Sequence, residues 1–522
     1  MANRSVFAST RGRLSPKADA TTAHGTPAYS YAAPHALAQM AVTGSFGGAY
    51  YAKPEMQLDR VLSLAGAVEP AFLARTAIHA RRVGRMKDMP AVLLAVLASR
   101  DPALFRAVFG RVVANGRMLR TFVQILRSGR TGRKSLGSAP KAMVAGWLTS
   151  ASDRALLEAA IGTSPSLKDV IRMVHPKPDS REREALFAWI LGRPCEAARL
   201  PQAVRDWIAF QEAGPQAWTG PLPEVPFQML TQAPLTQAQW AGIARNGSWQ
   251  MLRQGLNMLL RHGAFEDPET VAAVAARLSD PERIEAAGAL PYQLLAAIGH
   301  VDPRMPGEIV EALHLAMDHA VRRAPALEGA VVVCPDVSAS MLGSVTGVRK
   351  GATSAMRHVD LAGLVAAAIL RRNPRAEVLP FARALRPIRL EPRDTVASNA
   401  RRLAEIAGGG TDCSAPLRAL NARGARPDLV VMISDNQSWI DAAHAGRGTA
   451  TMTEWLALRA RHPSAKLVCI DIAPYGTTQA AEVEGVLNVG GFSDAVFDQI
   501  GRFARGEMHP DRWMAEIEAI AL

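Results

Sequence analysis

The 522-residue sequence lacks the features that mark membrane, secreted and several catalytic proteins. Its longest strongly apolar run, residues 89–98, is about ten residues long, whereas a membrane-spanning helix needs about 20. It contains no P-loop, GxSxG, HExxH or histidine cluster, which argues against the enzyme classes built on those motifs. The few cysteines are widely separated and form no CxxC pair, which favours a reducing, cytoplasmic compartment; they are Cys195, Cys334, Cys413 and Cys469.

The sequence begins MANRSVFASTRGRLSPK, which is basic but has no apolar core of the kind found in a secretory signal. We therefore interpret residues 1–35 as a basic N-terminal arm. An organellar transit peptide is the alternative, because Arg and Ser are frequent here and Asp19 is the first acidic residue.

Acidic residues are absent between Pro102 and Ser152, a segment that contains nine Lys and Arg residues. Residues 1–150 carry 21 Lys+Arg against 6 Asp+Glu, a balance of +15, while residues 151–522 carry 39 against 41, a balance of −2. A segment with charges of one sign repels itself, so it indicates an anionic partner, for which nucleic acid is the leading candidate. The alternative is an arginine-rich composition without function. It does not explain why the charges of residues 151–522 are nearly balanced.

Apolar residues recur at helical spacing from about Pro54 to Arg323, and strand-like alternation is scarce there. Four Asp-Pro pairs predict helix starts, with Asp as the N-cap and Pro in the first turn; the Asp residues are Asp101, Asp267, Asp280 and Asp302. We expect short antiparallel helix pairs stacked as an α-solenoid, over residues 36–325.

After residue 325, short β-branched runs alternate with helical segments. The runs GAVVVC, AEVLPF, DLVVMIS and KLVCIDI predict strands, separated or followed by the helical segments DLAGLVAAAILRR, SNARRLAEIA, MTEWLALRAR and DAVFDQIGRFA. This alternation is typical of a parallel sheet covered on both faces, so residues 326–522 are predicted to form a doubly wound α/β domain.

Oxygen-bearing side chains follow the first predicted strand at every second position, as Asp336, Ser338 and Ser340. Thr411 follows a triple-glycine turn, and Asp435 follows another strand. Ligand sites gather at the carboxyl ends of parallel strands, and hard oxygen ligands suit Mg²⁺. The alternative is that these are ordinary turn residues. A phosphatase is disfavoured, because Ser338 stands where the second acid of a haloacid-dehalogenase site is needed.

The order D-x-S-x-S, then Thr, then a strand-end Asp resembles the metal-ion-dependent adhesion site of von Willebrand factor A domains. That resemblance implies that Ser338 and Ser340 bind the ion directly and that Thr411 does so directly or through water. It implies that Asp336 and Asp435 act largely through water. A metal-dependent protein-interaction module, binding an acidic partner through this domain, is the alternative function.

Two groups of basic residues are candidate phosphate ligands. The first lies in the stretch RSGRTGRKSLGSAPK, where small residues allow a loop to follow a phosphate backbone; it comprises Arg127, Arg130, Arg133, Lys134 and Lys141. Lys168, Arg172 and His175 form the second, spaced 4 and 3 apart and therefore on one side of a helix. The alternative for the first group is a disordered basic surface loop. The alternative for the second is that Lys168 and Arg172 are solvated helix charges and that His175 caps a helix end.

Several segments resemble the Ro ribonucleoprotein family, whose helical module is called TROVE. The resemblance is carried by ALAQMAVTGSFGGAYY (36–51), AIHARRVGRMKDMPAVLLAVLA, GRKSLGSAPKAMVAGWL (132–148) and above all SLKDVIRMVHPKP (166–178), and DVSASM, GGGTDC and SDNQ fit the family's A domain. A bacterial-type homologue of this family is implied, with a HEAT-like helical ring closed by the A domain and no catalytic activity.

The same resemblance implies that Y-like small RNA binds outside the ring and that single-stranded 3′ ends of misfolded RNA enter its hole. It also implies a role in RNA quality control, a 3′ exoribonuclease partner and, since one chain forms the ring, a monomer. This chain departs from the family at Glu158 and Gly162, where further bases are expected on the RNA face. We therefore expect the outer surface to be weaker or rebuilt.

Overall fold

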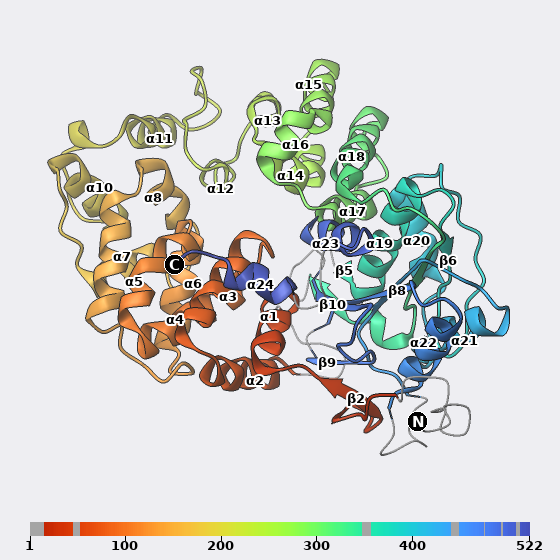
Figure 1. Ribbon diagram of the computed structural model, residues 1–522. Coiled ribbons are helices and arrows are strands. Elements are labelled where there is room, and N and C mark those ends of the chain that lie inside the picture. The colour runs from red at the N-terminus through yellow and green to blue at the C-terminus, as the bar shows by residue number, and fades with distance from the viewer. Residues whose placement is uncertain are drawn as a thin grey trace, which may run out of the picture.

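A computed structural model describes residues 15–44, 53–346, 356–439, 448–473, 475–491, 494–507 and 512–522. It has a long helical region followed by an α/β domain with a parallel sheet, as Figure 1 shows. The predicted fold class is confirmed. Within these ranges no helix is long and apolar enough to cross a membrane.

The helical region is a succession of mostly short helices joined by turns and loops. Their bounds are α1 (Ala33–Thr43), α2 (Pro54–Ala67), α3 (Pro70–Arg82), α4 (Asp88–Arg100), α5 (Pro102–Val112), α6 (Gly116–Arg127), α7 (Ser138–Ser150), α8 (Asp153–Ala160), α9 (Leu167–Val174), α10 (Arg181–Leu191), α11 (Gln202–Ala213), α12 (Phe227–Leu230), α13 (Gln237–Asn246), α14 (Trp249–Arg261), α15 (Pro268–Ser279), α16 (Pro281–Ala287), α17 (Pro291–Gly299) and α18 (Gly307–Ala320). In α6 the buried residues include Met118, Phe122 and Leu126, which recur every four positions and so form one apolar stripe.

Three of the four Asp-Pro pairs start helices as predicted. The Asp101 side chain accepts hydrogen bonds from the first-turn N–H groups of α5, and Asp267 and Asp280 do the same for α15 and α16. The prediction at Asp302 is wrong. Its carboxylate accepts the backbone N–H of Arg304 in a turn, and helix α18 begins later, at Gly307.

The α/β domain is built on a five-stranded parallel sheet with the order β10-β8-β7-β3-β6. The strands are β3 (Val331–Pro335), β6 (Glu377–Val378), β7 (Leu429–Ser434), β8 (Lys466–Asp471) and β10 (Val486–Gly490). Alternate residues of β3 pack into different cores, with Val331 and Val333 on one face and Val332 and Cys334 on the other. The sheet is therefore buried on both faces.

Helices cover both faces of this sheet. They are α19 (His358–Arg372), α20 (Val396–Glu405), α21 (Ala415–Ala422), α22 (Ala450–Arg461) and α23 (Asp494–Ala504). The buried residues of α19 and α20 share a core with Val333, whereas those of α21 and α22 share one with Val332. The sequence predicted β3, β6, β7 and β8 and helices α19, α20, α22 and α23, but it missed β10 and α21.

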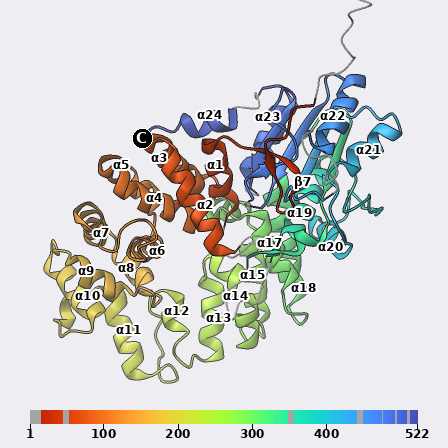
Figure 2. The same cartoon turned by 90° about the horizontal axis from the view of Figure 1, so that it is seen from below.

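The helical region begins and ends against the same α/β domain. Strands β1 (Ala20–Thr21) and β2 (Pro27–Ser30) pair with each other, β2 pairs with β9 (Thr477–Thr478), and α1 packs against β10. Helix α24 (Arg512–Glu518), near the C-terminal end of the chain, returns to pack against α3, as Figure 2 shows. The chain therefore closes on itself, with the α/β domain between the first and last helices of the helical region.

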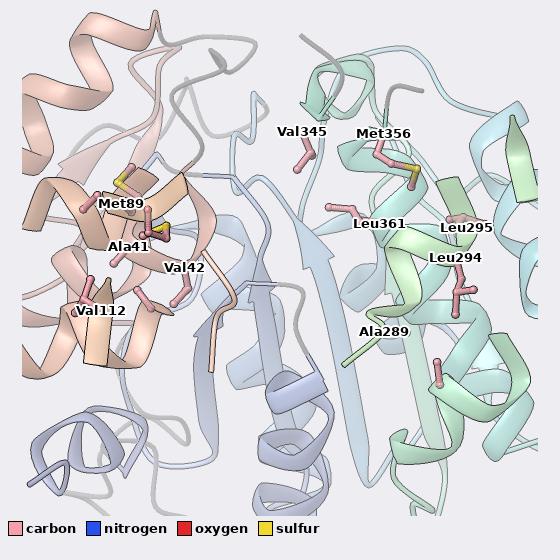
Figure 3. Close-up of a cluster of buried hydrophobic side chains, with 14 of the residues drawn as sticks. Ala41, Val42, Met89, Val112, Ala289, Leu294, Leu295, Val345, Met356 and Leu361 are labelled. Atoms are coloured by element: carbon pink, nitrogen blue, oxygen red, sulfur yellow. The ribbon is translucent and has the colours of Figure 1, made fainter. Parts of the chain in front are cut away.

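Hydrophobic packing joins the two regions into one continuous core. Figure 3 shows Ala41 and Met89 of the first helices in a cluster that also includes Leu294 of α17 and Leu361 of α19. The predicted boundaries at residues 35 and 325 stay predictions, because the described part of the arm forms strands with the C-terminal half of the chain.

Candidate functional site

Asp336 and Asp435 leave the sheet at its topological switch point. In the sheet, β3 lies between β6 and β7. The chain runs from β3 to β6 at one edge of the sheet and from β7 to β8 in the opposite direction, so the strand order reverses between β3 and β7. The two strands are in register up to Pro335 and Ile433, and the N–H of Asp336 donates to the Ile433 carbonyl at 2.9 Å. Asp336 is the residue after Pro335 and Asp435 is the second residue after Ile433, so both carboxylates lie at the carboxyl ends of these neighbouring strands.

The D-x-S-x-S loop folds into a compact set of oxygen atoms. The Asp336 carboxylate accepts the Ser338 N–H at 2.8 Å and the Ser434 hydroxyl at 2.6 Å. The Ser338 and Ser340 Oγ atoms lie 3.2 Å apart. Gly409, at φ +85°, lets the neighbouring loop approach, and its carbonyl accepts the Ala339 N–H at 2.9 Å.

One carboxylate oxygen in this cluster has no partner in the described part of the chain. Asp435 Oδ1 accepts the Gln437 N–H at 3.1 Å, whereas its Oδ2 is buried without a hydrogen bond. A buried, unpaired carboxylate oxygen is costly, and a cation beside it would remove that cost. Thr411 is also buried, with 3% of its surface exposed, and its backbone carbonyl accepts the Trp439 N–H.

Burial raises the pKa of Asp336 to about 6, although hydrogen bonds from Ser338 and Ser434 oppose the shift. The pKa of Asp435 rises to about 7, first because of burial and then because of the charge on Asp336. The two carboxylates therefore repel each other where a divalent cation would stabilise both. This electrostatic demand and the hard oxygen donors fit Mg²⁺.

Hydroxyl groups are essential to any such site. Nowhere in the described ranges do three or more His, Cys, Asp or Glu side chains converge to hold a metal. The serine and threonine oxygens, with water, would have to complete the coordination. Asp412 does not join them, because its carboxylate accepts hydrogen bonds from Ser414 and from Arg418, the latter at 2.9 Å.

Sequence reasoning missed Asp471, the last residue of β8. It is 1% exposed, pairs in register with Ser434, and burial raises its pKa to about 7. Gln39 of α1 donates a hydrogen bond to its carboxylate at 3.2 Å. The sequence KLVCIDI marked this strand, but only the sheet order shows that its end lies beside that of β7.

The first basic group extends from the carboxyl end of α6 through the loop that follows to Lys141 in the first turn of α7. Arg127, Arg130, Lys134 and Lys141 are exposed, and Arg133 is half-buried. Arg130 forms an ion pair with Asp59 at 2.5 Å, and Arg133 donates to the Ala98 carbonyl at 3.3 Å. The rest of the group makes no ion pair within the described residues.

The second group lies beside the first. Helix α9 begins with a capping box between Ser166 and Asp169 and buries Leu167, Val170, Ile171 and Val174. Lys168 and Arg172 are on the exposed side of α9. His175 is also exposed, but it lies just past the helix as its C-cap residue, at φ 48°, which is the alternative that the sequence left open. Arg127 reaches Met173 of α9, with Nη1 2.6 Å from Sδ, so the carboxyl end of α6 adjoins the helix that carries the second group. We call these eight residues the basic surface.

Comparison with known proteins was made at the levels of sequence and structure. Residues 330–504 match the family described as the Ro60 vWA domain. The chain is 28% identical over 364 residues to RNA-binding protein RO60 of Deinococcus radiodurans, and the match spans 66% of each protein, slightly under two thirds. The crystal structure of the Deinococcus radiodurans RO (RSR) protein has a similar fold, with a TM-score of 0.60 and 23% identity, covering 91% of this chain and 100% of that one.

Proposed function

We propose that the chain is a member of the Ro family that binds RNA and has no catalytic activity of its own. The relative in Deinococcus radiodurans, which is named as an RNA-binding protein, supports this proposal. The observation that carries it is the basic surface, whose exposed Lys and Arg side chains come from α6, the loop after it, α7 and α9 and make one ion pair within the described residues.

These side chains suit a phosphate backbone better than a set of bases. They reach into solvent from a loop and from the ends of two helices, and no exposed aromatic ring is interleaved with them. We propose that a small Y-like RNA binds this surface and that single-stranded 3′ ends of misfolded RNA enter the closed helical ring. The protein would then act as a cytoplasmic, monomeric scaffold for RNA quality control, with a 3′ exoribonuclease as a partner.

A binding assay tests this proposal directly. Affinity is measured for structured RNA with and without a single-stranded 3′ tail, at two salt concentrations, for the wild type and for the triple variant Arg130→Ala, Arg133→Ala, Lys134→Ala. For each phosphate that the variant no longer neutralises, the slope of log affinity against log salt should fall by about 0.7 to 0.9. The proposal would be refuted if the affinity were the same with and without the tail and the same for the wild type and the triple variant.

We also propose that Asp336, Ser338, Ser340, Thr411 and Asp435 hold Mg²⁺. When bound, the ion supplies a positively charged coordination position for an oxygen of a ligand. The residues themselves orient the oxygen donors and exclude bulk water, and the unpaired Asp435 Oδ2 supports the assignment.

A second candidate function is metal-dependent capture of a protein with an acidic side chain. It is favoured by two large apolar side chains that remain exposed on the loops of this site, Leu342 at 39% and Trp439 at 51%. In this case Asp336→Ala should abolish partner capture in the presence of Mg²⁺ and leave RNA binding unchanged. Capture that persists in EDTA would exclude it.

A further inference from the structure

The helical region contains a cavity of about 1590 Å³ that none of the site predictions includes. It lies between α6 and α8 on one side and α13 and α14 on the other, and Figures 1 and 2 both show the short helix α12 between them. Its two sides differ in chemistry. Arginines line the first side, whereas side-chain amides and a tryptophan line the second.

The arginine side is formed mainly by Arg117 and Arg120, which are three residues apart and so lie on the same side of α6. Arg117 is in the first turn, where the N–H groups already make the potential positive, and this turn contains no acidic residue. Its guanidinium has no hydrogen bond or ion pair within the described residues. A second positive charge at a helix N-terminus is unfavourable for the helix alone, and a bound anion would offset it.

Arg120 is held in place by the protein itself. Its Nη1 donates to the Pro165 carbonyl at 3.1 Å, and its Nη2 donates to the Ile161 carbonyl. Gly162, at φ +113°, leaves the space that this guanidinium occupies, because a Cβ there would lie 2.5 Å from Nη1. The glycine that departs from the family's RNA face therefore has a local role in placing Arg120 at the cavity.

Acidic residues offset only part of this charge. Glu158 and Glu224 also line the cavity, but Glu158 is engaged by Arg154, with Nε 3.3 Å from Oε1. Among the cavity-lining arginines, Arg117 is therefore the cation without a partner in the described part of the chain, and Arg120 adds its charge nearby. This arrangement fits phosphate oxygens, which a guanidinium can bind through two parallel hydrogen bonds.

The opposite side presents two free amides. Gln228 of α12 and Gln254 of α14 are exposed and make no side-chain hydrogen bond within the described residues. The three other glutamines of the lining are already used, since Gln216 donates to the Pro234 carbonyl, Gln239 caps α13 and Gln250 donates to the Ala287 carbonyl. The Trp218 indole also lines the cavity and is anchored through Nε1 to the Pro221 carbonyl at 3.0 Å.

We propose that this cavity reads the bases of a single RNA strand and favours adenine. Arg117 binds its phosphates while the fixed guanidinium of Arg120 adds positive charge nearby, Gln228 and Gln254 pair with base edges, and Trp218 stacks on a base. A glutamine amide presents a donor and an acceptor side by side, which match N6 and N7 of adenine. Only an unpaired strand exposes these edges, because the major groove of an RNA duplex is deep and narrow.

The inference rests on the proposed RNA binding and adds base preference to it. The experiment measures affinity for one RNA hairpin that carries a 3′ tail of adenines, cytosines or uridines, using the full-length protein. We expect the wild type to bind the adenine tail about tenfold more tightly than the others. The double variant Gln228→Ala, Gln254→Ala should bind all tails equally, with an unchanged salt dependence.

Two further variants separate the roles of the two sides. Arg117→Ala should weaken binding of every tail alike and reduce the salt slope by about 0.7, because it leaves one phosphate without its cation. Gln124→Ala, a substitution of an exposed glutamine on α6 that does not line the cavity, should behave as the wild type. Circular dichroism confirms that each variant is folded.

The outcomes distinguish this inference from the proposed function. If the wild-type protein binds the hairpin equally well with and without a tail, the proposed binding of 3′ ends is wrong. Tail-dependent binding with equal affinity for adenine, cytosine and uridine would overturn base reading alone. Base reading by these residues is also overturned if the preference survives in the double glutamine variant.

Discussion

The oxygen cluster of the α/β domain and the basic surface of the helical region use charge in opposite ways. Asp336, Ser338 and Asp435 are at most 1% exposed, and one carboxylate oxygen has no hydrogen-bond partner among the described residues. On the basic surface, Lys134, Lys168 and Arg172 are exposed to solvent. A buried charge acts at short range and demands a well-placed partner, whereas exposed charges act together and are screened by salt. The first arrangement suits one ion and the second suits a polyanion.

The largest expected effect sharpens this comparison at the oxygen cluster. Wild-type protein should gain about 2.7 kcal/mol of unfolding free energy when Mg²⁺ is present at 100 times its Kd, since the ion binds the folded state. Asp336→Ala should abolish this gain entirely. Thermal unfolding in EDTA and in Mg²⁺ measures the difference.

The matched control for this prediction is Asp412→Asn. Asp412 is also a buried carboxylate near the site, but its partners are Ser414 and Arg418. This variant should lose stability and retain the Mg²⁺-dependent gain. A variant at Asp336 that still responds to Mg²⁺ as the wild type does would show that the ion binds elsewhere.

A somewhat smaller effect is expected where the two regions meet. Gln39→Leu removes the hydrogen bond from α1 to the buried Asp471 carboxylate. We expect a loss of about 1–3 kcal/mol of unfolding free energy, because that carboxylate loses a donor and cannot reach water. Urea unfolding measures the loss, with Gln124→Leu on the exposed side of α6 as the control. Equal stability of the two variants would mean that the hydrogen bond does not stabilise closure.

Charge reversal on the basic surface should change binding more than stability. The double variant Lys168→Glu, Arg172→Glu is expected to lower affinity for a small structured RNA about tenfold or more at low salt, and less at high salt. Its melting temperature should remain close to that of the wild type, because both side chains are exposed. Arg375→Glu, at an exposed position of the α/β domain, is the control. The same loss in both variants would indicate a nonspecific effect of net charge.

The smallest expected effect concerns the helix that presents part of this surface. Ser166→Ala removes the N-cap of α9, whose hydroxyl accepts the Asp169 N–H at 3.2 Å. The loss should be about 1 kcal/mol of unfolding free energy, and Ser166→Thr should restore most of it. Chemical denaturation measures both changes. No loss in the alanine variant would show that packing of Leu167 and Val170 alone fixes the helix.

The sequence predicted the fold well where local patterns are strong. The run VVVC and the stripe of Met118, Phe122 and Leu126 have the periods of a buried strand and of an amphipathic helix, and the structure contains both. The prediction of a helix start at Asp302 was wrong because the same local Asp-Pro pattern occurs at helix starts and in turns. The candidate ligands Asp336 and Asp435 could be named in advance, since strand ends in a parallel sheet gather at one edge.

Other features depend on the packing of distant segments. The place of Asp471 beside the oxygen cluster follows from the order of β8 and β7, and its donor Gln39 lies 432 residues earlier. The cavity that Arg117 shares with Gln228 and Gln254 exists because helices far apart in the chain face each other.

The periodicity of the helices and strands, the acid-free segment and the spacing of the oxygen ligands can be read from neighbouring residues, because they are local properties of the chain. Which charges are buried, which are exposed and which residues share a cavity depends on how the whole chain packs. Burial and opposition of side chains arise when the chain closes on itself, and no short stretch of residues contains that information.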